Sequence, residues 1–328
     1  WLITGGCGFI GRSLIARLLA AGTPAGHIRV FDNLSVGTLD DLRGVVAVAE
    51  GPASWAADAA GCEVVVGDIR EREAIARAAQ GADVIVHLAA CTGVQPSVED
   101  PLFDCETNVT GTVNGLEAAR AAGVKRFVFA SSGAPLGAVQ PPIHEEVMPR
   151  PISPYGASKL AGEGYCSAYY ACFGVETVAL RFGNVYGPLS SRKNSVVARF
   201  IKQALAGETL EIYGDGSATR DYIFAGDLTG AIIDAATVAG VGGEIFQIAT
   251  SRETTVDELA ERLRGVLAGF GVDDFKVVHG AARAGDMQRN YSDTTKARER
   301  LGWQAATSLD EGLQATVAWF LERDASKA

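Results

Sequence analysis

A glycine-rich turn lies between a short apolar run and an amphipathic helical pattern in the first residues of this chain. It reads Thr4-Gly5-Gly6-Cys7-Gly8-Phe9-Ile10-Gly11. Glycine lets the backbone turn tightly and approach a pyrophosphate, and the N-terminus of the following helix supplies N–H groups and a positive dipole end. The next apolar run ends at Asp32, whose carboxylate can accept hydrogen bonds from ribose hydroxyls. These features predict a dinucleotide site, and because Asp32 would repel a 2′-phosphate and no Arg immediately follows it, NAD is favoured over NADP.

Short β-type runs alternate with longer helical patterns along the first part of the chain. We expect strands at residues 1–4, 27–31, 63–66, 83–88, 126–130 and 175–181, and helices at 10–20, 71–79, 103–122 and 155–173. This alternation predicts right-handed βαβ units and a parallel sheet covered on both faces. The predicted fold class is therefore α/β, a Rossmann-type doubly wound parallel sheet.

The rhythm becomes less regular after residue 181, where turns such as Gly214-Asp215-Gly216 appear. We expect residues 1–181 to form the nucleotide-binding domain and residues 182–328 a smaller substrate domain. A strand-like run at 244–249 is expected to return to the first sheet within a segment near 221–250, so the two domains are interleaved. The chain opens without Met inside an apparent strand, and we expect a short preceding segment.

Composition excludes several classes of protein. With 29 basic and 39 acidic residues, the formal net charge of −10 disfavours nonspecific binding to nucleic acid or an anionic membrane. No apolar run reaches the ~18 residues that a membrane span needs. The six cysteines form no C-x-x-C pair and no metal-ligand spacing with the four histidines. We therefore expect reduced thiols, no metal and a cytoplasmic location.

Tyr155 and Lys159 lie one helical turn apart, which places them on a common helix face. A phenol has an unperturbed pKa of about 10, so a tyrosine that acts as a base near neutral pH needs a nearby positive charge to stabilise its phenolate. The pair alone is more typical of an exposed helix face. It becomes informative only together with the dinucleotide signature.

Further motifs follow in a fixed order along the whole chain. They are His87-Leu88-Ala89-Ala90, Asn108, Ser131-Ser132, Tyr155 with Lys159, Arg181-Phe182-Gly183-Asn184-Val185-Tyr186-Gly187-Pro188, Thr219-Arg220-Asp221-Tyr222 and Arg283-Ala284-Gly285-Asp286. With these residues the chain resembles the extended short-chain dehydrogenases/reductases, within them the nucleotide-sugar epimerases, closest in type to UDP-glucose 4-epimerase.

The resemblance implies a role for each matching residue. Ser132 would hydrogen-bond the sugar hydroxyl that is oxidised, Tyr155 would be the acid/base, and Lys159 would bind the nicotinamide ribose and lower the pKa of Tyr155. The predicted NAD contacts are Gly5, Gly8, Phe9, Ile10, Gly11, Asp32, Asn33, Asp68, Ile69, Leu88, Ala89, Ala90, Asn108, Tyr155 and Lys159. The predicted UDP-sugar contacts are Ser132, Gly133, Asn184, Arg192, Val196, Tyr213, Arg220, Arg283 and Asp286. Asp68 is nearly as plausible as a loop cap, and for Asn108 a structural role ranks equal to a functional one.

The residues after Ser132 bear on the reaction. Related dehydratases and decarboxylases carry acidic residues there, whereas this chain has Gly133 and Ala134. This favours a UDP-sugar 4-epimerase over a UDP-glucuronate decarboxylase or a sugar-nucleotide 4,6-dehydratase; a simple dehydrogenase or a noncatalytic NAD sensor also remains open. Arg192 could pair with a C6 carboxylate, so UDP-glucuronate/UDP-galacturonate stays open beside UDP-glucose/UDP-galactose and UDP-N-acetylhexosamines. By resemblance, helices 103–122 and 155–173 would form a homodimer interface.

Overall fold

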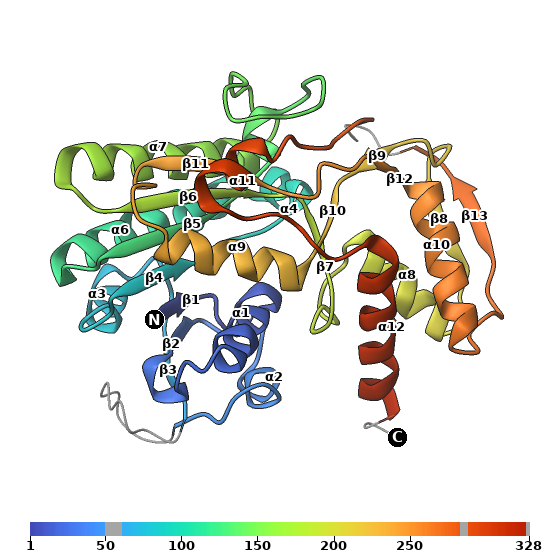
Figure 1. Ribbon diagram of the computed structural model, residues 1–328, viewed down its shortest axis with the longest axis horizontal. Helices are drawn as coiled ribbons and strands as arrows, with labels where there is room; N and C mark the ends of the chain where they lie inside the picture. The colour runs from blue at the N-terminus through green and yellow to red at the C-terminus, as the bar shows by residue number, and fades with distance from the viewer. Residues whose placement is uncertain (50–60, 283–287, 326–328) are drawn as a thin grey trace.

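A parallel β-sheet forms the centre of the molecule (Figure 1). The computed structural model describes residues 1–49, 61–282 and 288–325. Within these ranges the central sheet has seven strands, all parallel to their neighbours. Their spatial order is β11 (Glu244–Ile248), β6 (Thr177–Phe182), β5 (Arg126–Ser132), β4 (Val84–His87), β1 (Leu2–Thr4), β2 (Arg29–Asp32) and β3 (Glu63–Val66). The predicted α/β doubly wound sheet is confirmed.

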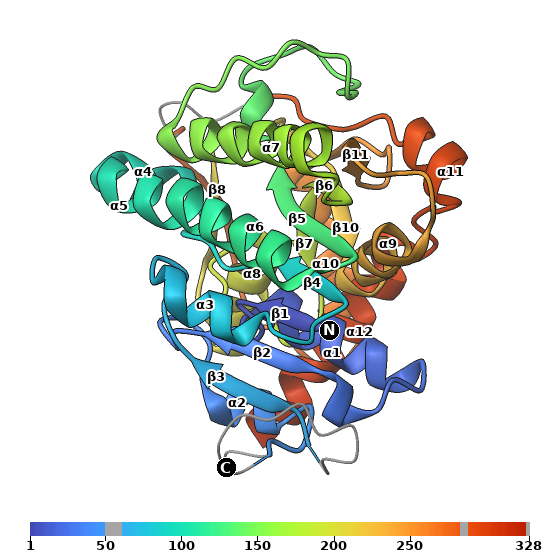
Figure 2. The same cartoon turned by 90° about the vertical axis from the view of Figure 1, so that its left-hand side faces the viewer.

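Helices cover both faces of this sheet, which explains why its strands are apolar almost throughout (Figure 2). One face packs against α1 (Phe9–Ala20), α9 (Ala225–Thr237) and α11 (Thr295–Leu301). The other packs against α3 (Arg72–Ala78), α6 (Gly111–Ala122) and α7 (Pro154–Phe173). In β5, six of the seven residues are buried.

Strand β11 comes from late in the sequence but completes the edge of the sheet beside β6. Residues 244 to 248 pair in parallel with residues 178 to 182. Helix α9, which precedes β11, packs onto the same sheet. The predicted return of the chain to the first sheet is therefore confirmed, whereas the boundary at residue 181 stays a prediction.

The predicted helix 103–122 is not regular. The structure divides it into α5 (Pro101–Cys105), a π-helical turn at Glu106–Thr110 and α6, and places a further helix, α4 (Val94–Glu99), before them. A π-turn has i→i+5 hydrogen bonds and occurs mostly as a single turn inside an α-helix, and no motif in this sequence marks it. Such turns occur frequently at functional sites.

A second, smaller core lies beside the carboxyl ends of the central strands. It is built from α8 (Val196–Leu205), α10 (Val256–Gly269), α12 (Leu309–Ala325), β8 (Leu210–Tyr213) and β13 (Val277–Gly280). Two further pairs join β7 (Asn184–Tyr186) with β10 (Tyr222–Phe224) and β9 (Thr219–Arg220) with β12 (Thr254–Thr255). A short helix, α2 (Leu39–Arg43), follows β2.

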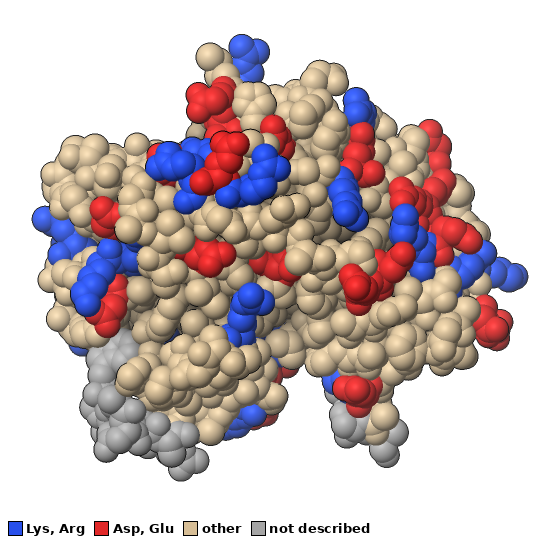
Figure 3. All heavy atoms as spheres, in the orientation of Figure 1, with Lys and Arg blue, Asp and Glu red and all other residues tan. Residues whose placement is uncertain are grey.

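The surface carries both signs of charge. On the face drawn in Figure 3, Lys and Arg side chains lie interspersed with Asp and Glu side chains. Among the described residues, no helix is both long and apolar enough to cross a membrane.

Candidate active site

A cavity of about 660 Å³ opens where the strand order reverses between β1 and β4. This reversal is where doubly wound sheets bind their ligands. The cavity runs from the glycine turn after β1, past the ends of β4 and β5, to residues beside the second core, such as Tyr213 at the end of β8 and Arg220 on β9. One cavity therefore joins the predicted dinucleotide and substrate regions.

The glycine turn needs its glycines because other backbone segments approach it closely. Gly5 has φ +69°, and a Cβ on it would lie 2.8 Å from the backbone nitrogen of Ala89. A Cβ on Gly11 would lie 2.5 Å from the Cα of Gly6. Helix α1 begins directly after Gly8, which makes no side-chain cap, so backbone N–H groups face the cavity end of the helix. This arrangement fits a pyrophosphate.

Asp32 ends β2 and lines the cavity beside this turn. Its Oδ2 accepts a hydrogen bond from the Cys7 backbone N–H at 2.9 Å, and its Oδ1 accepts one from the Leu34 N–H at 2.8 Å. Burial raises the pKa of Asp32, although these two N–H donors oppose the shift. The carboxylate thus braces the glycine turn while keeping lone pairs for a ribose.

Asp68 also lines the cavity, and its neighbour Arg70 is a residue that the sequence motifs did not single out. The Arg70 side chain donates to both carboxylate oxygens of Asp68 at 2.9 Å, and the Arg70 backbone N–H donates to Oδ1 at 2.9 Å. The Arg70 hydrogen bond is the main cause that lowers the pKa of Asp68 to about 2. The alternative interpretation of Asp68 as a loop cap is therefore realised, together with its place in the cavity wall.

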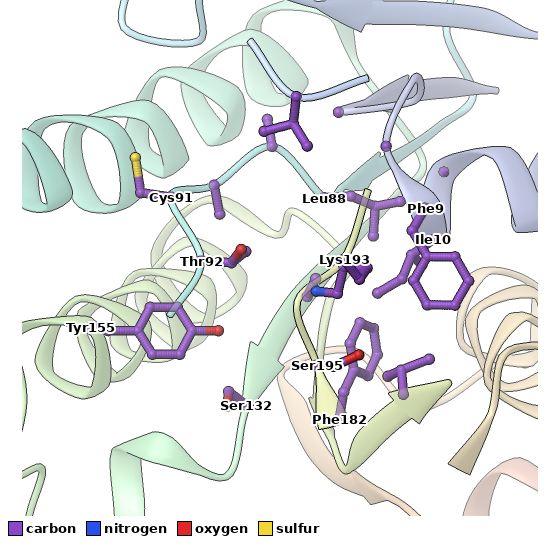
Figure 4. Close-up of a pocket in the computed structure, with 18 of the residues that line it drawn as sticks. Phe9, Ile10, Leu88, Cys91, Thr92, Ser132, Tyr155, Phe182, Lys193 and Ser195 are labelled. Carbon is purple, nitrogen blue, oxygen red and sulfur yellow. The ribbon is translucent and has the colours of Figure 1, made fainter. Parts of the chain in front are cut away.

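Ser132, Tyr155 and Lys159 all lie in the wall of the cavity. Figure 4 shows the side chains of Ser132 and Tyr155 there. Ser132 is the last residue of β5. Tyr155 lies in the first turn of α7, where Ser153 caps the helix by accepting a hydrogen bond from the Gly156 N–H at 3.1 Å. The side chains of Tyr155 and Ser132 are hydrogen-bonded. The Lys159 Nζ donates to the Ala130 carbonyl at 2.9 Å and lies 5.9 Å from the centre of the Tyr155 ring.

In the protein without NAD the pKa of Tyr155 is raised, so the lowering expected from Lys159 and the nicotinamide ring stays a prediction for the NAD-bound protein. Burial raises the pKa of Tyr155, and the hydrogen bond with Ser132 only partly offsets this. Burial also lowers the pKa of Lys159 to about 8, because its ammonium is costly to desolvate. Spacing along a helix could not predict this balance, which depends on how deeply both groups are buried.

Asn108 does not line the cavity, which corrects its predicted place among the cofactor contacts. Its Oδ1 accepts from the Cys91 N–H at 2.8 Å, and its Nδ2 donates to the Cys91 carbonyl at 3.0 Å. The side chain thus fixes the backbone at Cys91, which follows the cavity-lining Ala89 and Ala90. Of the two alternatives weighed for Asn108, this placement supports the structural one.

The predicted substrate contacts fall into three groups. Asn184, Val196, Tyr213 and Arg220 line the cavity, as Ser132 does. Gly133 is not in its lining, although it follows Ser132 directly. Arg283 and Asp286 lie outside the described residues.

Arg192 lies outside the cavity wall and is 47% exposed. Its Nε donates to Asp41 Oδ2 at 2.6 Å, in the nucleotide-binding part of the chain. Its neighbour Lys193 lines the cavity instead, close to Ser195 in the view of Figure 4. Burial lowers the pKa of Lys193. The sequence indicated a cationic loop here, but it could not indicate which of two adjacent side chains points inward.

Other residues that line the cavity lie outside the sequence motifs and were not predicted. They include Cys91, Thr92, Phe103 and Arg199. The Arg199 guanidinium lies 4.8 Å from the centre of the Tyr213 ring, which fixes that ring at the end of β8. In the described part of the chain, no three or more His, Cys, Asp or Glu side chains gather as they would around a metal ion.

Comparisons with known proteins agree with this fold. The family model described as "NAD dependent epimerase/dehydratase family" matches residues 1–249. The UDP-glucose 4-epimerase of Mycolicibacterium smegmatis is 39% identical over 324 residues, 97% of each chain. The crystal structure of UDP-glucose 4-epimerase with UDP-glucose from Thermotoga maritima has a TM-score of 0.86 at 34% identity, covering 98% of each chain. The Thermus thermophilus UDP-glucose 4-epimerase in complex with NAD has a TM-score of 0.83 at 33% identity, again over 98% of each chain. This chain therefore belongs to the NAD dependent epimerase/dehydratase family.

Proposed function

We propose that this protein is an NAD-dependent isomerase that inverts C4 of a UDP-sugar. One observation carries the proposal: Ser132, Tyr155 and Lys159 line one cavity, between the glycine turn and the basic side chains beside the second core. The UDP-glucose 4-epimerases that this chain resembles over nearly its full length support the same activity. In this proposal residues 1–181, with the returning segment near 221–250, hold the cofactor and residues 182–328 hold the nucleotide sugar.

The residues of the glycine cradle fit NAD. The backbone at Gly5, Gly8 and Gly11 would hold the pyrophosphate, and Asp32 would accept hydrogen bonds from a ribose whose 2′-hydroxyl is free. NAD, when bound, supplies a hydride acceptor that can also return the hydride.

Side chains of this protein carry out the proton transfers. Tyr155 takes the C4 hydroxyl proton while Ser132 holds the same oxygen, and Tyr155 gives the proton back when the sugar is reduced on its other face. Lys159 supplies positive charge beside Tyr155. Arg220 and Lys193 supply cationic groups for the diphosphate at the far side of the cavity. Ser132, Tyr155 and Lys159 can therefore serve both the oxidation of the C4 hydroxyl and the reduction of the 4-keto sugar.

The environment of Gly133 supports epimerisation over elimination or decarboxylation. A Cβ at Gly133 would meet no atom within 4 Å, so the backbone leaves space for a side chain to begin there, yet residues 133 and 134 are Gly and Ala. The site therefore lacks the acidic group beside Ser132 that would act on a 4-keto sugar after its oxidation.

The test is incubation of the protein with UDP-glucose, UDP-glucuronate and UDP-N-acetylglucosamine while the anomeric and C4 proton signals are followed by NMR. Inversion at C4 without net NADH formation is the expected result. A 4-keto-6-deoxy sugar, a pentose product, or NADH formed in step with substrate would identify the dehydratase, the decarboxylase or the simple dehydrogenase, respectively. Full activity in Tyr155→Phe would contradict the proposed acid/base.

A homodimer and a cytoplasmic location are also part of the proposal. Exposed apolar side chains on α4, α5 and α7 suit a helical interface, with Val98, Leu102 and Phe173 each more than half exposed. Sedimentation velocity of the protein and of Leu102→Glu tests the dimer, which the substitution is expected to weaken. All six cysteines are free thiols, which agrees with a reducing compartment; cell fractionation tests this.

A further inference from the structure

Asp104 is a buried carboxylate behind the active site that the proposed chemistry does not use. It lies on α5 and is only 2% exposed. Its Oδ1 accepts a hydrogen bond from the Asn108 Nδ2 at 2.9 Å, whereas its Oδ2 is buried and makes no hydrogen bond to any described residue. Burying a carboxylate oxygen without a hydrogen-bond partner costs free energy of folding, so a functional role for Asp104 would explain why an acidic residue stands here.

Asp104 belongs to a network that joins three elements around Tyr155. Asn108, which Asp104 orients, holds the backbone of Cys91 at the cavity wall through two hydrogen bonds. Its Nδ2 also lies 3.2 Å from the Ser158 Oγ on α7, and that hydroxyl donates to the Tyr155 carbonyl at 3.0 Å. The π-helical turn at Glu106–Thr110 is where Asn108 sits. Asp104 therefore couples the cavity loop to the first turn of α7.

Several other charged or titratable groups surround Tyr155 and Lys159. Glu163 and Cys166 lie on α7, Cys91 on the loop after β4 and His87 on β4. Glu163 is neutralised by Arg181, whose Nε and Nη2 donate to its two oxygens at 2.8 Å. Burial, with a smaller effect from Lys159, lowers the pKa of His87 to about 3, so this ring is neutral near pH 7.

Asp104 differs from Glu163 because no cation among the described residues is bonded to its carboxylate. The charge of Asp104 therefore acts on Tyr155 and Lys159 with less compensation by a bonded cation than the charge of Glu163 does. Burial is the main cause of the low pKa of Lys159, and Asp104 is the largest of the influences that raise it again. Burial is the main cause that raises the pKa of Tyr155, and the charge of Asp104 raises it further.

We propose that Asp104 is a positioning residue that holds Tyr155 and Lys159 in register with the cavity loop and sets, by its charge, the pH range over which they exchange protons. The inference rests on the proposed function of that same site. A negative charge favours the ammonium and disfavours the phenolate, so its removal makes both groups lose their protons at lower pH. Because the two groups interact, the limbs of the pH profile report the pair and not single residues.

The experiment uses the NAD-loaded protein and the isosteric variant Asp104→Asn, which keeps the acceptor oxygen for Asn108. The profile of kcat/KM against pH is measured for the UDP-sugar that NMR identifies as substrate. Both limbs are expected to move to lower pH by roughly half a unit or more. Asp104→Glu, which keeps the charge, should leave both limbs near those of the wild type.

Asp100→Asn is the matched control. Asp100 is exposed and caps the same helix by accepting from the Phe103 N–H at 3.0 Å, and asparagine caps equally well. One carboxylate charge is thus removed from α5 without touching the site. Its pH profile should not move.

A second readout is independent of turnover. Ultraviolet difference absorbance of tyrosinate, with Tyr155→Phe in each background as the reference, follows the ionisation of Tyr155 directly. The phenolate should appear at lower pH in Asp104→Asn, or in Asp104→Ser if the first variant does not fold. A slower enzyme with unmoved limbs and an unmoved tyrosinate titration would overturn the inference and leave Asp104 a purely structural role. Failure of the wild type to invert C4 would refute the proposed function, while the titration would still decide the effect of the charge.

Discussion

The ion pair between Glu163 and Arg181 is buried beneath the active site, and its removal yields a quantitative prediction. Each side chain is 2% exposed, and the two nitrogen–oxygen contacts are both 2.8 Å. Ser131, next to the catalytic Ser132, also donates to Glu163 at 2.6 Å. The pair therefore joins α7 to the ends of β5 and β6.

Glu163→Ala would leave the Arg181 charge buried without a carboxylate. Breaking one side of such a pair costs about 3–5 kcal/mol. For 328 residues the unfolding entropy is about 0.7 kcal/mol/K, so Tm should fall by roughly 4–7 °C. The exposed pair of Glu73 and Arg77 serves as the control, and Glu73→Ala should cost less than about 1 kcal/mol.

Thermal unfolding of the wild type and these variants, followed by circular dichroism at fixed protein and NAD concentration, measures the difference. The double variant Glu163→Met/Arg181→Met should be more stable than Glu163→Ala, because it removes the isolated charge and fills the space. A Tm for Glu163→Ala within one degree of the wild type, or a double variant as unstable as the sum of its single variants, would refute the reasoning.

Three further predictions address the site and its pH dependence. Tyr155→Phe should lower kcat for C4 inversion about 10²–10⁴-fold without changing the fold, as measured by NMR and circular dichroism. Lys193→Ala should raise the KM for the UDP-sugar more than Arg192→Ala, because Lys193 lines the cavity whereas Arg192 is exposed and pairs with the Asp41 carboxylate outside it; equal effects in steady-state kinetics would contradict this. Asp68, whose pKa is lowered to about 2 mainly by Arg70, should contribute stability above its unfolded pKa of about 3.9 that is lost as pH falls toward 2. Because Arg70 is partly exposed, the difference between wild type and Asp68→Asn in acid unfolding should stay below about 1 kcal/mol.

Much of the fold could be predicted from short-range pattern. The glycine turn, the apolar strands and the helices between them are local features, and their alternation leaves few ways to build a sheet. The strand-like run at 244–249 was expected to return to the first sheet, but its place at the edge beside β6 was not predicted. The π-turn around Asn108 was not predicted, because no residue motif in this stretch marks it.

The site was predictable where a motif defines the backbone geometry. It was less predictable where neighbouring side chains could each have pointed into the cavity. Gly5, Asp32, Ser132 and Tyr155 lie in the cavity wall as expected, because each sits at the end of a strand or the start of a helix. Gly133, Arg192 and Asn108 do not, and Lys193 lines the wall instead of its neighbour.

The sequence by itself determined the order of the elements, the glycine cradle and the Tyr155–Lys159 spacing, because these depend on residues close together in the chain. Only the tertiary structure decided the electrostatics of that pair. Burial raises the pKa of Tyr155 and lowers that of Lys159, and Asp104 acts on both from another helix. Desolvation and charge act through space, so they depend on which groups the fold packs together and how deeply it buries them.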